Sequence, residues 1–299
     1  MPSTISSKSL LPDRPVLRFA PSPNGRLHLG HALSALTGYE LARRLGGDFL
    51  LRIEDIDPAR SRPKFIDGIF RDLEWLGIRW AEPVWRQSAR FACYDAAAAR
   101  LIEMGLLYPC FASRAQILAA AVPGAVDPDG APLYPSLHHA LPADAIEQRR
   151  SRGEPHVMRI DMAAALARVA PQLAYGSLSF TAFDAQLRHQ TIAAEPARWG
   201  DAVIQRKDVP TSYHLSVVVD DAAQGITHVV RGQDLLAATD LHRLLQTLLG
   251  LPAPAYHHHG LIRDSNGRKL SKSLKDTSLA ELRASGLTRA DVRRMTGLT

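Results

Sequence analysis

The fold of this chain is decided by Val16-Leu17-Arg18-Phe19-Ala20-Pro21-Ser22-Pro23-Asn24-Gly25-Arg26-Leu27-His28-Leu29-Gly30-His31. Residues 16–20 are apolar enough to predict a short buried strand. The two prolines cannot continue a ladder of hydrogen bonds, and the Asn-Gly pair is typical of a turn. Residues 32–45 then read as a helix that ends at a glycine pair. The stretch therefore predicts a strand, a tight turn and the start of a helix.

This arrangement favours an anion-binding site. The first N–H groups of a helix have no partners within the helix and point outward. Gly30 lets a ligand approach the backbone closely. His28 and His31 lie three residues apart, so on a helical turn both can reach one phosphate. The alternative from these residues alone is an ordinary helix start that carries two histidines.

Three acids, Glu54, Asp55 and Asp57, follow a second predicted strand over residues 48–53. Ligands of open α/β sheets bind beyond the carboxyl ends of the strands, so these acids could hold a cation such as an ammonium group. The same residues could instead form a capping loop, with Asp57 as the helix N-cap and Pro58 as the first helical residue. We expect Asp57 to cap and Glu54 to be the ligand.

The rest of the chain alternates between helical and β-rich segments. Helices are predicted over 66–76, 91–104, 240–249, 281–287 and 289–295, and β-rich runs over 154–160, 178–184, 201–208, 225–232 and 257–259. Residues 211–221 are expected to pass from helix to strand. Residues 108–150, which are rich in Pro, Gly and Ala, read as an insertion between two halves of a nucleotide-binding sheet.

Composition narrows the class of protein. The chain has 299 residues, of which 46% are hydrophobic and 22% charged, with a formal net charge of +6. These values are ordinary for a globular cytoplasmic protein, and the basic balance fits a nucleic-acid partner. Cys93 and Cys110 do not suggest a disulfide framework, and no apolar run is long enough to span a membrane. The polar residues 1–15 are expected to be a disordered leader.

Several motifs together resemble one enzyme family. His28-Leu29-Gly30-His31 is similar to the first signature of the class I aminoacyl-tRNA synthetases, and residues 18–23 narrow the resemblance to the glutamyl and glutaminyl branch. Residues 53–60 are similar to the I-E-D-T-D-x-x-R block of the glutamyl synthetases, with Ile56 in place of threonine. Residues 201–234 resemble a long pattern of the same branch. Lys269-Leu270-Ser271-Lys272-Ser273 resembles the second class I signature.

The resemblance implies an α/β fold, a Rossmann-type class I synthetase catalytic domain with an inserted small subdomain and a short helical C-terminal segment. Few residues follow Ser273, so no anticodon-binding domain is expected and residues 16–299 resemble the truncated glutamyl-Q tRNA(Asp) synthetases. The expected domains are a leader (1–15), the first catalytic half (16–107), an acceptor-type or zinc-knot-like insertion (108–195), the second catalytic half (196–265) and a lysine loop with a helical tail (266–299).

That family activates glutamate with ATP as glutamyl-adenylate and attaches it to queuosine in the anticodon of tRNA(Asp). The resemblance therefore implies a cytoplasmic, monomeric ligase without a membrane partner. Its implied cofactors are ATP and Mg²⁺, and its implied partners are L-glutamate, ATP and queuosine-containing tRNA(Asp). Two other functions stay open. One is a discrete glutamyl-tRNA synthetase that acts on a tRNA acceptor end, and the other is a catalytically inactive, synthetase-like RNA-binding protein.

The resemblance also implies roles for individual residues. The implied L-glutamate ligands are Arg18, Ala20, Ser22, Glu54, Tyr213 and Arg231. The implied ATP contacts are His28, Gly30, His31, Lys269, Ser271 and Lys272, of which His28, His31 and Lys272 are catalytic. Arginines suit the two carboxylates of glutamate and an acid suits its ammonium. The alternative to a ligand role for Arg231 is a surface ion pair with Asp234. Asp220 and Asp221 are expected to be structural acids of a turn.

Relatives in this branch carry a zinc-binding knot in the insertion, with C-x-C and Y-x3-C spacing. Here the candidate ligands are Cys110, Tyr134 and His138, and Ala112 stands where the second thiolate would be. A structural zinc site uses four good ligands. We therefore expect a metal-free knot, with a zinc site as the alternative.

Overall fold

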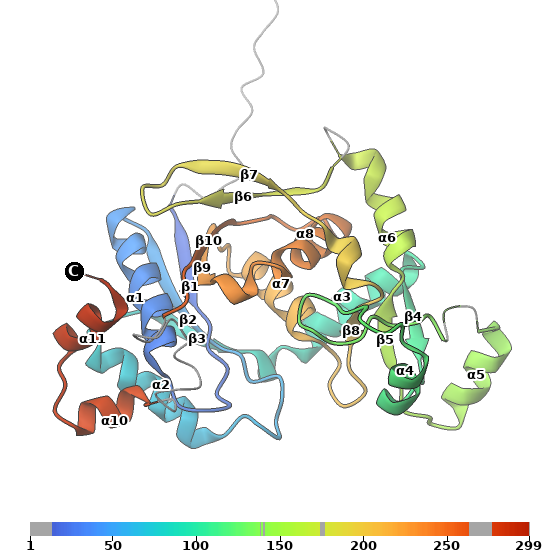
Figure 1. Ribbon diagram of the computed structural model, residues 1–299, viewed down its shortest axis with the longest axis horizontal. Coiled ribbons are helices and arrows are strands. Elements are labelled where there is room, and N and C mark those ends of the chain that lie inside the picture. The colour runs from blue at the N-terminus through green and yellow to red at the C-terminus, as the bar shows by residue number, and fades with distance from the viewer. Residues whose placement is uncertain (1–13, 138, 140, 174–176, 263–276, 299) are drawn as a thin grey trace, which may run out of the picture.

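A seven-stranded sheet forms the centre of the molecule (Figure 1). The computed structural model describes residues 14–137, 139, 141–173, 177–262 and 277–298. In spatial order the strands are β3 (Ala81–Arg86), β2 (Asp48–Ile53), β1 (Val16–Phe19), β9 (His228–Gly232), β10 (Ala255–His259), β6 (Ser179–Phe183) and β7 (His189–Ala193). Neighbouring strands pair in parallel, except for the antiparallel pair of β6 and β7.

The strand order reverses at β1. The chain first extends the sheet from β1 through β2 to β3, and later returns to the other side of β1 with β9 and β10. Ligands of open α/β sheets bind beyond the carboxyl ends of the strands at such a reversal. The turn at 21–28 leaves β1 at this point, so the predicted anion-binding turn lies where the topology favours a site. The predicted Rossmann-type α/β fold is confirmed.

Helices cover both faces of the sheet. The main ones are α1 (Leu29–Arg44), α2 (Pro63–Trp75), α3 (Phe91–Glu103), α7 (Tyr213–Ala223) and α8 (Ala238–Leu249). Helices α1 and α2 pack on one face, where Leu17, Leu51 and Val230 join their buried core. Helices α7 and α8 pack with α3 in a second core. Within the described ranges, no helix is both long and apolar enough to cross a membrane.

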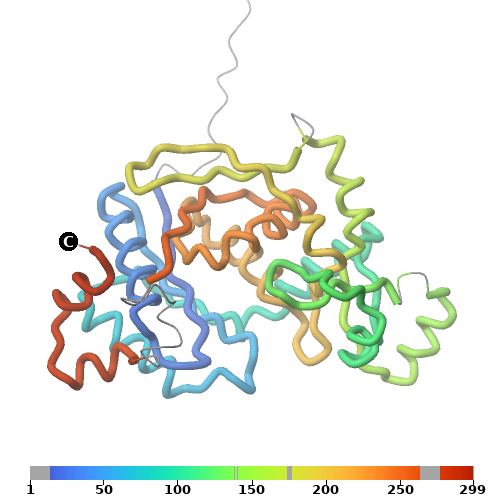
Figure 2. The backbone as a smooth tube through the Cα atoms, viewed as in Figure 1, coloured from blue at the N-terminus to red at the C-terminus, as the bar shows by residue number. Residues whose placement is uncertain are grey.

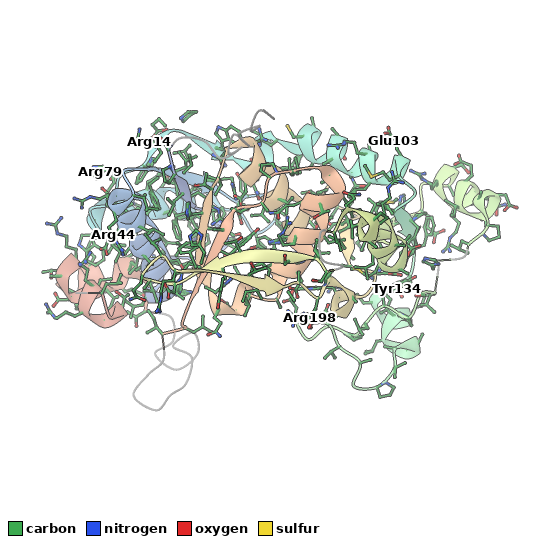
Figure 3. All side chains as sticks on the ribbon, turned by 90° about the horizontal axis from the view of Figure 1, so that it is seen from above. Arg14, Arg44, Arg79, Glu103, Tyr134 and Arg198 are labelled. Atoms are coloured by element: carbon green, nitrogen blue, oxygen red, sulfur yellow. The ribbon has the colours of Figure 1, made fainter. Side chains whose placement is uncertain are left out.

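A smaller sheet carries most of the insertion. Its strands are β4 (Leu107–Cys110), β5 (Val157–Ile160) and β8 (Val203–Gln205), all antiparallel, with α4 (Arg114–Ala120), α5 (Ala143–Ser151) and α6 (Met162–Val169) around them. Seen from above, Tyr134 lies in this part of the molecule, far from Arg44 of α1 (Figure 3). Strands β6 and β7, from the range 108–195, join the large sheet, whereas β8, from 196–265, joins the small one. The predicted domain limits therefore stay a prediction.

Two short helices near the C-terminus pack beside α2 and α1. They are α10 (Leu279–Ala284) and α11 (Arg289–Thr296), and each begins with a capping box that satisfies its first N–H groups. The N–H of Leu279 donates to the carbonyl of Leu27 at 2.8 Å, and Arg293 pairs with Glu40 of α1. Figure 2 shows this red segment beside the blue helix α1. These contacts tie the end of the described chain to the turn that precedes His28.

Two local predictions are wrong. Residues 211–221 do not pass into a strand, because α7 is one continuous helix whose N-cap, Ser212, accepts a hydrogen bond from Leu215. Its buried valines pack against neighbouring helices, and this packing outweighs their preference for strands. Asp57 does not cap α2, which starts at Pro63 after Arg62. Instead, Asp57 accepts hydrogen bonds from Arg60 in the loop after β2.

Candidate active site

Three neighbouring strands place an arginine on the same face of the large sheet. Side chains alternate across a strand, so Arg18 of β1, Arg52 of β2 and Arg231 of β9 point away from the face that α1 covers. They are 6%, 0% and 5% exposed, respectively. A buried charge is costly unless it is paired. The partners of these arginines therefore decide which ligands the site can hold.

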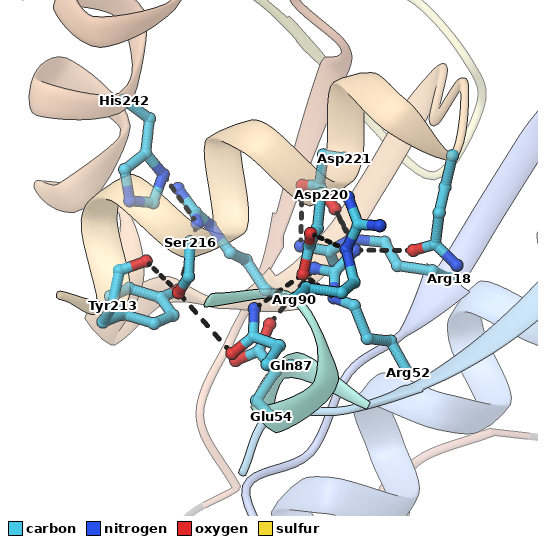
Figure 4. Close-up of polar contacts among 12 residues, drawn as sticks. Arg18, Arg52, Glu54, Gln87, Arg90, Tyr213, Ser216, Asp220, Asp221 and His242 are labelled. Carbon is cyan, nitrogen blue, oxygen red and sulfur yellow. Dashed lines mark hydrogen bonds and ion pairs between the residues drawn. The ribbon is translucent and has the colours of Figure 1, made fainter. Parts of the chain in front are cut away.

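Helix α7 supplies acids to the first two arginines. Asp221 accepts hydrogen bonds from Arg18 Nε at 3.0 Å and Nη2 at 3.2 Å, and it lies 2.8 Å from Arg52 Nη1. Burial would raise the pKa of Asp221, but Arg18 and Arg52 lower it below its usual value. Asp220 accepts a hydrogen bond from Arg90 Nε at 2.7 Å (Figure 4). The prediction that these two acids belong to a turn is wrong, because both are buried within the helix.

Glu54 lies directly after β2, beside this network. Arg52 Nη2 donates to Glu54 Oε1 at 3.1 Å. Burial raises the pKa of Glu54 above its usual value, and the lowering effects of Arg52 and Arg18 do not cancel this. A second cation next to Glu54 would favour its ionised form. The position therefore suits an ammonium ligand.

A cavity of about 450 Å³ opens at the switch point of the sheet. It is lined by the sequence-predicted ligands that the structure describes, namely Arg18, Ala20, Ser22, His28, Gly30, His31, Glu54, Tyr213 and Arg231. The expected glutamate ligands and the histidine turn thus share one cavity. Lys269, Ser271 and Lys272 lie outside the described residues. The role of each of these residues stays a prediction.

The two histidines of the turn cap their own helix. His28 is the N-cap of α1, and its Nδ1 accepts the N–H of Gly30 at 3.1 Å. Nδ1 of His31 in turn accepts the N–H of His28 at 3.2 Å. The expectation that the first helical N–H groups have no partner is thus wrong for the N–H of Gly30. Because each Nδ1 is an acceptor, each neutral imidazole carries its proton on Nε2 and can donate it to an anion.

The charge of His31 follows from its position. Burial and, to a lesser extent, the neighbouring His28 lower the pKa of His31 to about 3. The two rings are close, with their centroids 3.9 Å apart. His31 therefore acts near neutral pH as an uncharged hydrogen-bond donor. A phosphate in the cavity would therefore meet a dipole, rather than a positive charge, at His31.

Arg231 has an environment that the sequence did not reveal. The alternative of a surface ion pair with Asp234 is wrong, because Arg231 is 5% exposed and its partners among the described residues are uncharged. Its guanidinium donates to Thr239 Oγ1 at 2.6 Å and to His258 Nε2 at 3.2 Å, and lies 3.3 Å from His242 Nδ1. Sequence reasoning missed these three residues. No local pattern in the sequence points to them, because His258 comes to lie opposite Arg231 only through the parallel pairing of β9 and β10.

The candidate metal ligands of the insertion are only partly described. Cys110 and Tyr134 are both buried, and His138 lies outside the described residues. The guanidinium of Arg159 lies over the ring of Tyr134, with 4.0 Å between Cζ and the ring centroid. Among the residues that the structure describes, no group of three or more His, Cys, Asp or Glu side chains is placed to hold a metal ion. The metal-free knot stays a prediction.

Comparison with known proteins identifies the family. The model of the class I tRNA synthetases (E and Q), catalytic domain, matches residues 16–298. The chain belongs to this synthetase family. It is 45% identical over 297 residues to the glutamyl-Q tRNA(Asp) synthetase of Rhodobacter capsulatus, and the match covers 95% of this chain and 100% of that relative. It is 40% identical to the glutamyl-Q tRNA(Asp) synthetase of Symbiobacterium thermophilum, over 90% of this chain and 81% of that relative.

A solved structure of the same branch is also similar. The glutamate tRNA ligase from Elizabethkingia meningosepticum, in complex with its amino acid, superposes with a TM-score of 0.68 at 27% sequence identity. The match covers 89% of this synthetase and 53% of that ligase. The resemblance to the glutamyl-Q tRNA(Asp) synthetases is confirmed, and the chain is a ligase of the class I synthetase family. Enzymes of this family generally use ATP and Mg²⁺.

Proposed function

We propose that this synthetase activates L-glutamate with ATP as glutamyl-adenylate and then transfers the glutamyl group to queuosine in the anticodon of tRNA(Asp). The observation that carries the proposal is one cavity with charges opposite to those of glutamate, in a chain whose relatives are named for this reaction. Queuosine-containing tRNA(Asp), L-glutamate and ATP are its partners, and we expect the synthetase to act as a monomer in the cytoplasm.

The charges of the cavity suggest how glutamate is oriented. Glu54 receives the α-ammonium group, because it is the acid that lies beside Arg52 at the cavity wall. The α-carboxylate has to face the histidine turn, since it attacks ATP. The side-chain carboxylate then binds to Arg231. The hydroxyl of Tyr213 lies 3.5 Å from Nη1 of this arginine. Arg18 adds a second cation on the same sheet face, although Asp221 already accepts two of its hydrogen bonds.

In the first step an oxygen of the α-carboxylate forms a bond to the α-phosphorus of ATP, and the bond to pyrophosphate breaks. The Nε2–H groups of His28 and His31 donate to the phosphate oxygens, where negative charge increases. Lys269 and Lys272 neutralise the departing pyrophosphate, and Mg²⁺ accompanies the triphosphate. In the second step a queuosine hydroxyl attacks the adenylate carbonyl. AMP leaves, and the hydroxyl proton passes to its phosphate.

Charging assays with the purified protein, ATP and labelled glutamate test this function. We expect labelled RNA with queuosine-containing tRNA(Asp), and none with tRNA(Asp) that lacks queuosine or with tRNA(Glu). Charging of tRNA(Glu) at its acceptor end would identify a discrete glutamyl-tRNA synthetase instead. Absence of both charging and ATP–pyrophosphate exchange would identify a catalytically inactive RNA-binding protein.

Lys272→Ala should lower the rate of adenylate formation roughly 100-fold, because it removes a cation that neutralises the departing pyrophosphate. The apparent affinity for glutamate should change much less, since Lys272 has no part in the glutamate contacts. ATP–pyrophosphate exchange measures the first quantity, and the glutamate concentration for half-maximal exchange measures the second. An exchange rate equal to that of the unaltered protein would remove Lys272 from the mechanism.

A further inference from the structure

Arg231 differs from the other two buried arginines of the site in the kind of partner it has. Arg18 Nε and Arg52 Nη1 lie 3.0 Å and 2.8 Å, respectively, from a carboxylate oxygen of Asp221. Within the described ranges, Arg231 has hydrogen bonds to neutral groups and no ion pair, although it is only 5% exposed. A buried cation without a counter-charge is destabilising. The fold thus maintains one arginine in a state that a bound anion would stabilise.

Each of the three guanidinium nitrogens of Arg231 lies within hydrogen-bond distance of a neutral group. Nη2 donates to Thr239 Oγ1 at 2.6 Å, and Nε donates to His258 Nε2 at 3.2 Å. Nη1 lies 3.3 Å from His242 Nδ1 and 3.5 Å from the Tyr213 hydroxyl. Two of these groups come from one face of α8, three residues apart, and His258 comes from the strand next to β9. Among the described residues Nη2 contacts one acceptor, Thr239 Oγ1, so its second N–H is left for a ligand.

The histidines beside Arg231 are uncharged. Burial and then Arg231 lower the pKa of His258 to about 3. The same two causes hold the pKa of His242 well below its usual value. Nε2 of His242 lies 3.3 Å from Nδ1 of His214. Burial and Arg231 lower the pKa of His214 to about 4. These neighbours therefore orient the guanidinium without adding negative charge.

We propose that Thr239, His242 and His258 are positioning residues that hold Arg231 in place and leave its charge uncancelled, so that the site selects an acidic over an amide side chain. The proposal rests on the proposed function, in which Arg231 receives the side-chain carboxylate of glutamate. A carboxylate introduced among these neighbours would compete with the substrate for the same guanidinium. An amide of the same shape would remain neutral.

A matched pair of variants, His242→Glu and His242→Gln, separates charge from shape. In ATP–pyrophosphate exchange we expect the KM for glutamate to be about tenfold higher in His242→Glu than in His242→Gln, with kcat within about threefold. We also expect the preference for glutamate over glutamine, as a ratio of kcat/KM values, to be about tenfold lower in His242→Glu. Thermal unfolding adds a readout, because saturating glutamate should raise the Tm of His242→Gln more than that of His242→Glu.

Two outcomes would overturn separate parts of this account. Equal KM values, equal preferences and equal glutamate-induced Tm shifts in the pair would reject the positioning role, while Arg231→Gln could still raise the KM for glutamate. An unchanged KM for glutamate in Arg231→Gln would instead reject the part of the proposed function on which the inference rests. Should His242→Glu not fold, the pair His258→Glu and His258→Gln gives the same comparison, because His258 contacts the Nε side of Arg231.

Discussion

Glu54→Gln should lower kcat/KM for glutamate activation about 1,000-fold, which corresponds to about 4 kcal/mol. In the proposed function Glu54, which is only 8% exposed, is the partner of the α-ammonium group. Loss of one member of a buried, hydrogen-bonded charge pair leaves the other charge unpaired, and this has a large effect on binding. The KM for ATP should stay close to that of the unaltered protein, because Glu54 has no part in the nucleotide contacts.

The fold should tolerate this substitution. The amide oxygen of glutamine can still accept the hydrogen bond from Arg52 Nη2, and Arg52 keeps Asp221 at 2.8 Å. ATP–pyrophosphate exchange at varied glutamate and ATP concentrations measures the effect. If the KM for glutamate and kcat/KM both stayed the same, the ammonium group would have to bind elsewhere.

Asp57→Asn is the matched control for Glu54→Gln. Asp57 follows the same strand, but its carboxylate pairs with Arg60 and Arg206 and does not line the cavity of the proposed glutamate site. We therefore expect kcat/KM for glutamate to change less than about threefold in this variant. A loss as large as that of Glu54→Gln would mean that the whole loop after β2, rather than one carboxylate, supports activity.

Asp220→Asn should lower the free energy of unfolding by about 3–5 kcal/mol. Asp220 is fully buried in α7 and accepts hydrogen bonds from Arg90 Nε at 2.7 Å, Tyr94 Oη at 2.7 Å and Gln87 Nε2 at 3.1 Å. Asparagine has one acceptor oxygen and an NH₂ group, so it would turn a donor toward other donors. It would also leave the positive charge of Arg90 without its nearest acid.

Urea unfolding followed by circular dichroism measures this change. The control is Asp184→Asn, which removes the same charge from an exposed ion pair with Arg188. We expect the urea midpoint of the control to stay close to that of the unaltered protein, because exposed ion pairs contribute little. Equal midpoints for both variants would show that the buried network does not stabilise α7.

Local sequence patterns predict much of the catalytic sheet. Strands β1 and β2 and helices α1 and α8 follow from apolar spacing, glycine stops and turn residues, which act within a few positions along the chain. The passage from helix to strand predicted over 211–221 is wrong, since the valines of α7 favour a strand locally but become helical through packing in the core. The edge strand β7, which pairs with β6, had no clear signal in the sequence.

The sequence by itself determined the motifs of the class I family and nine of the residues that line the cavity, because each motif is contiguous and its chemistry is local. The tertiary structure decided the partners of the buried charges. Arg18 and Asp221 are 203 positions apart, so nothing local indicates that they pair. The neutral surroundings of Arg231 likewise arise where β10 and α8 pack against β9, since burial and pairing exist only after distant segments have come together.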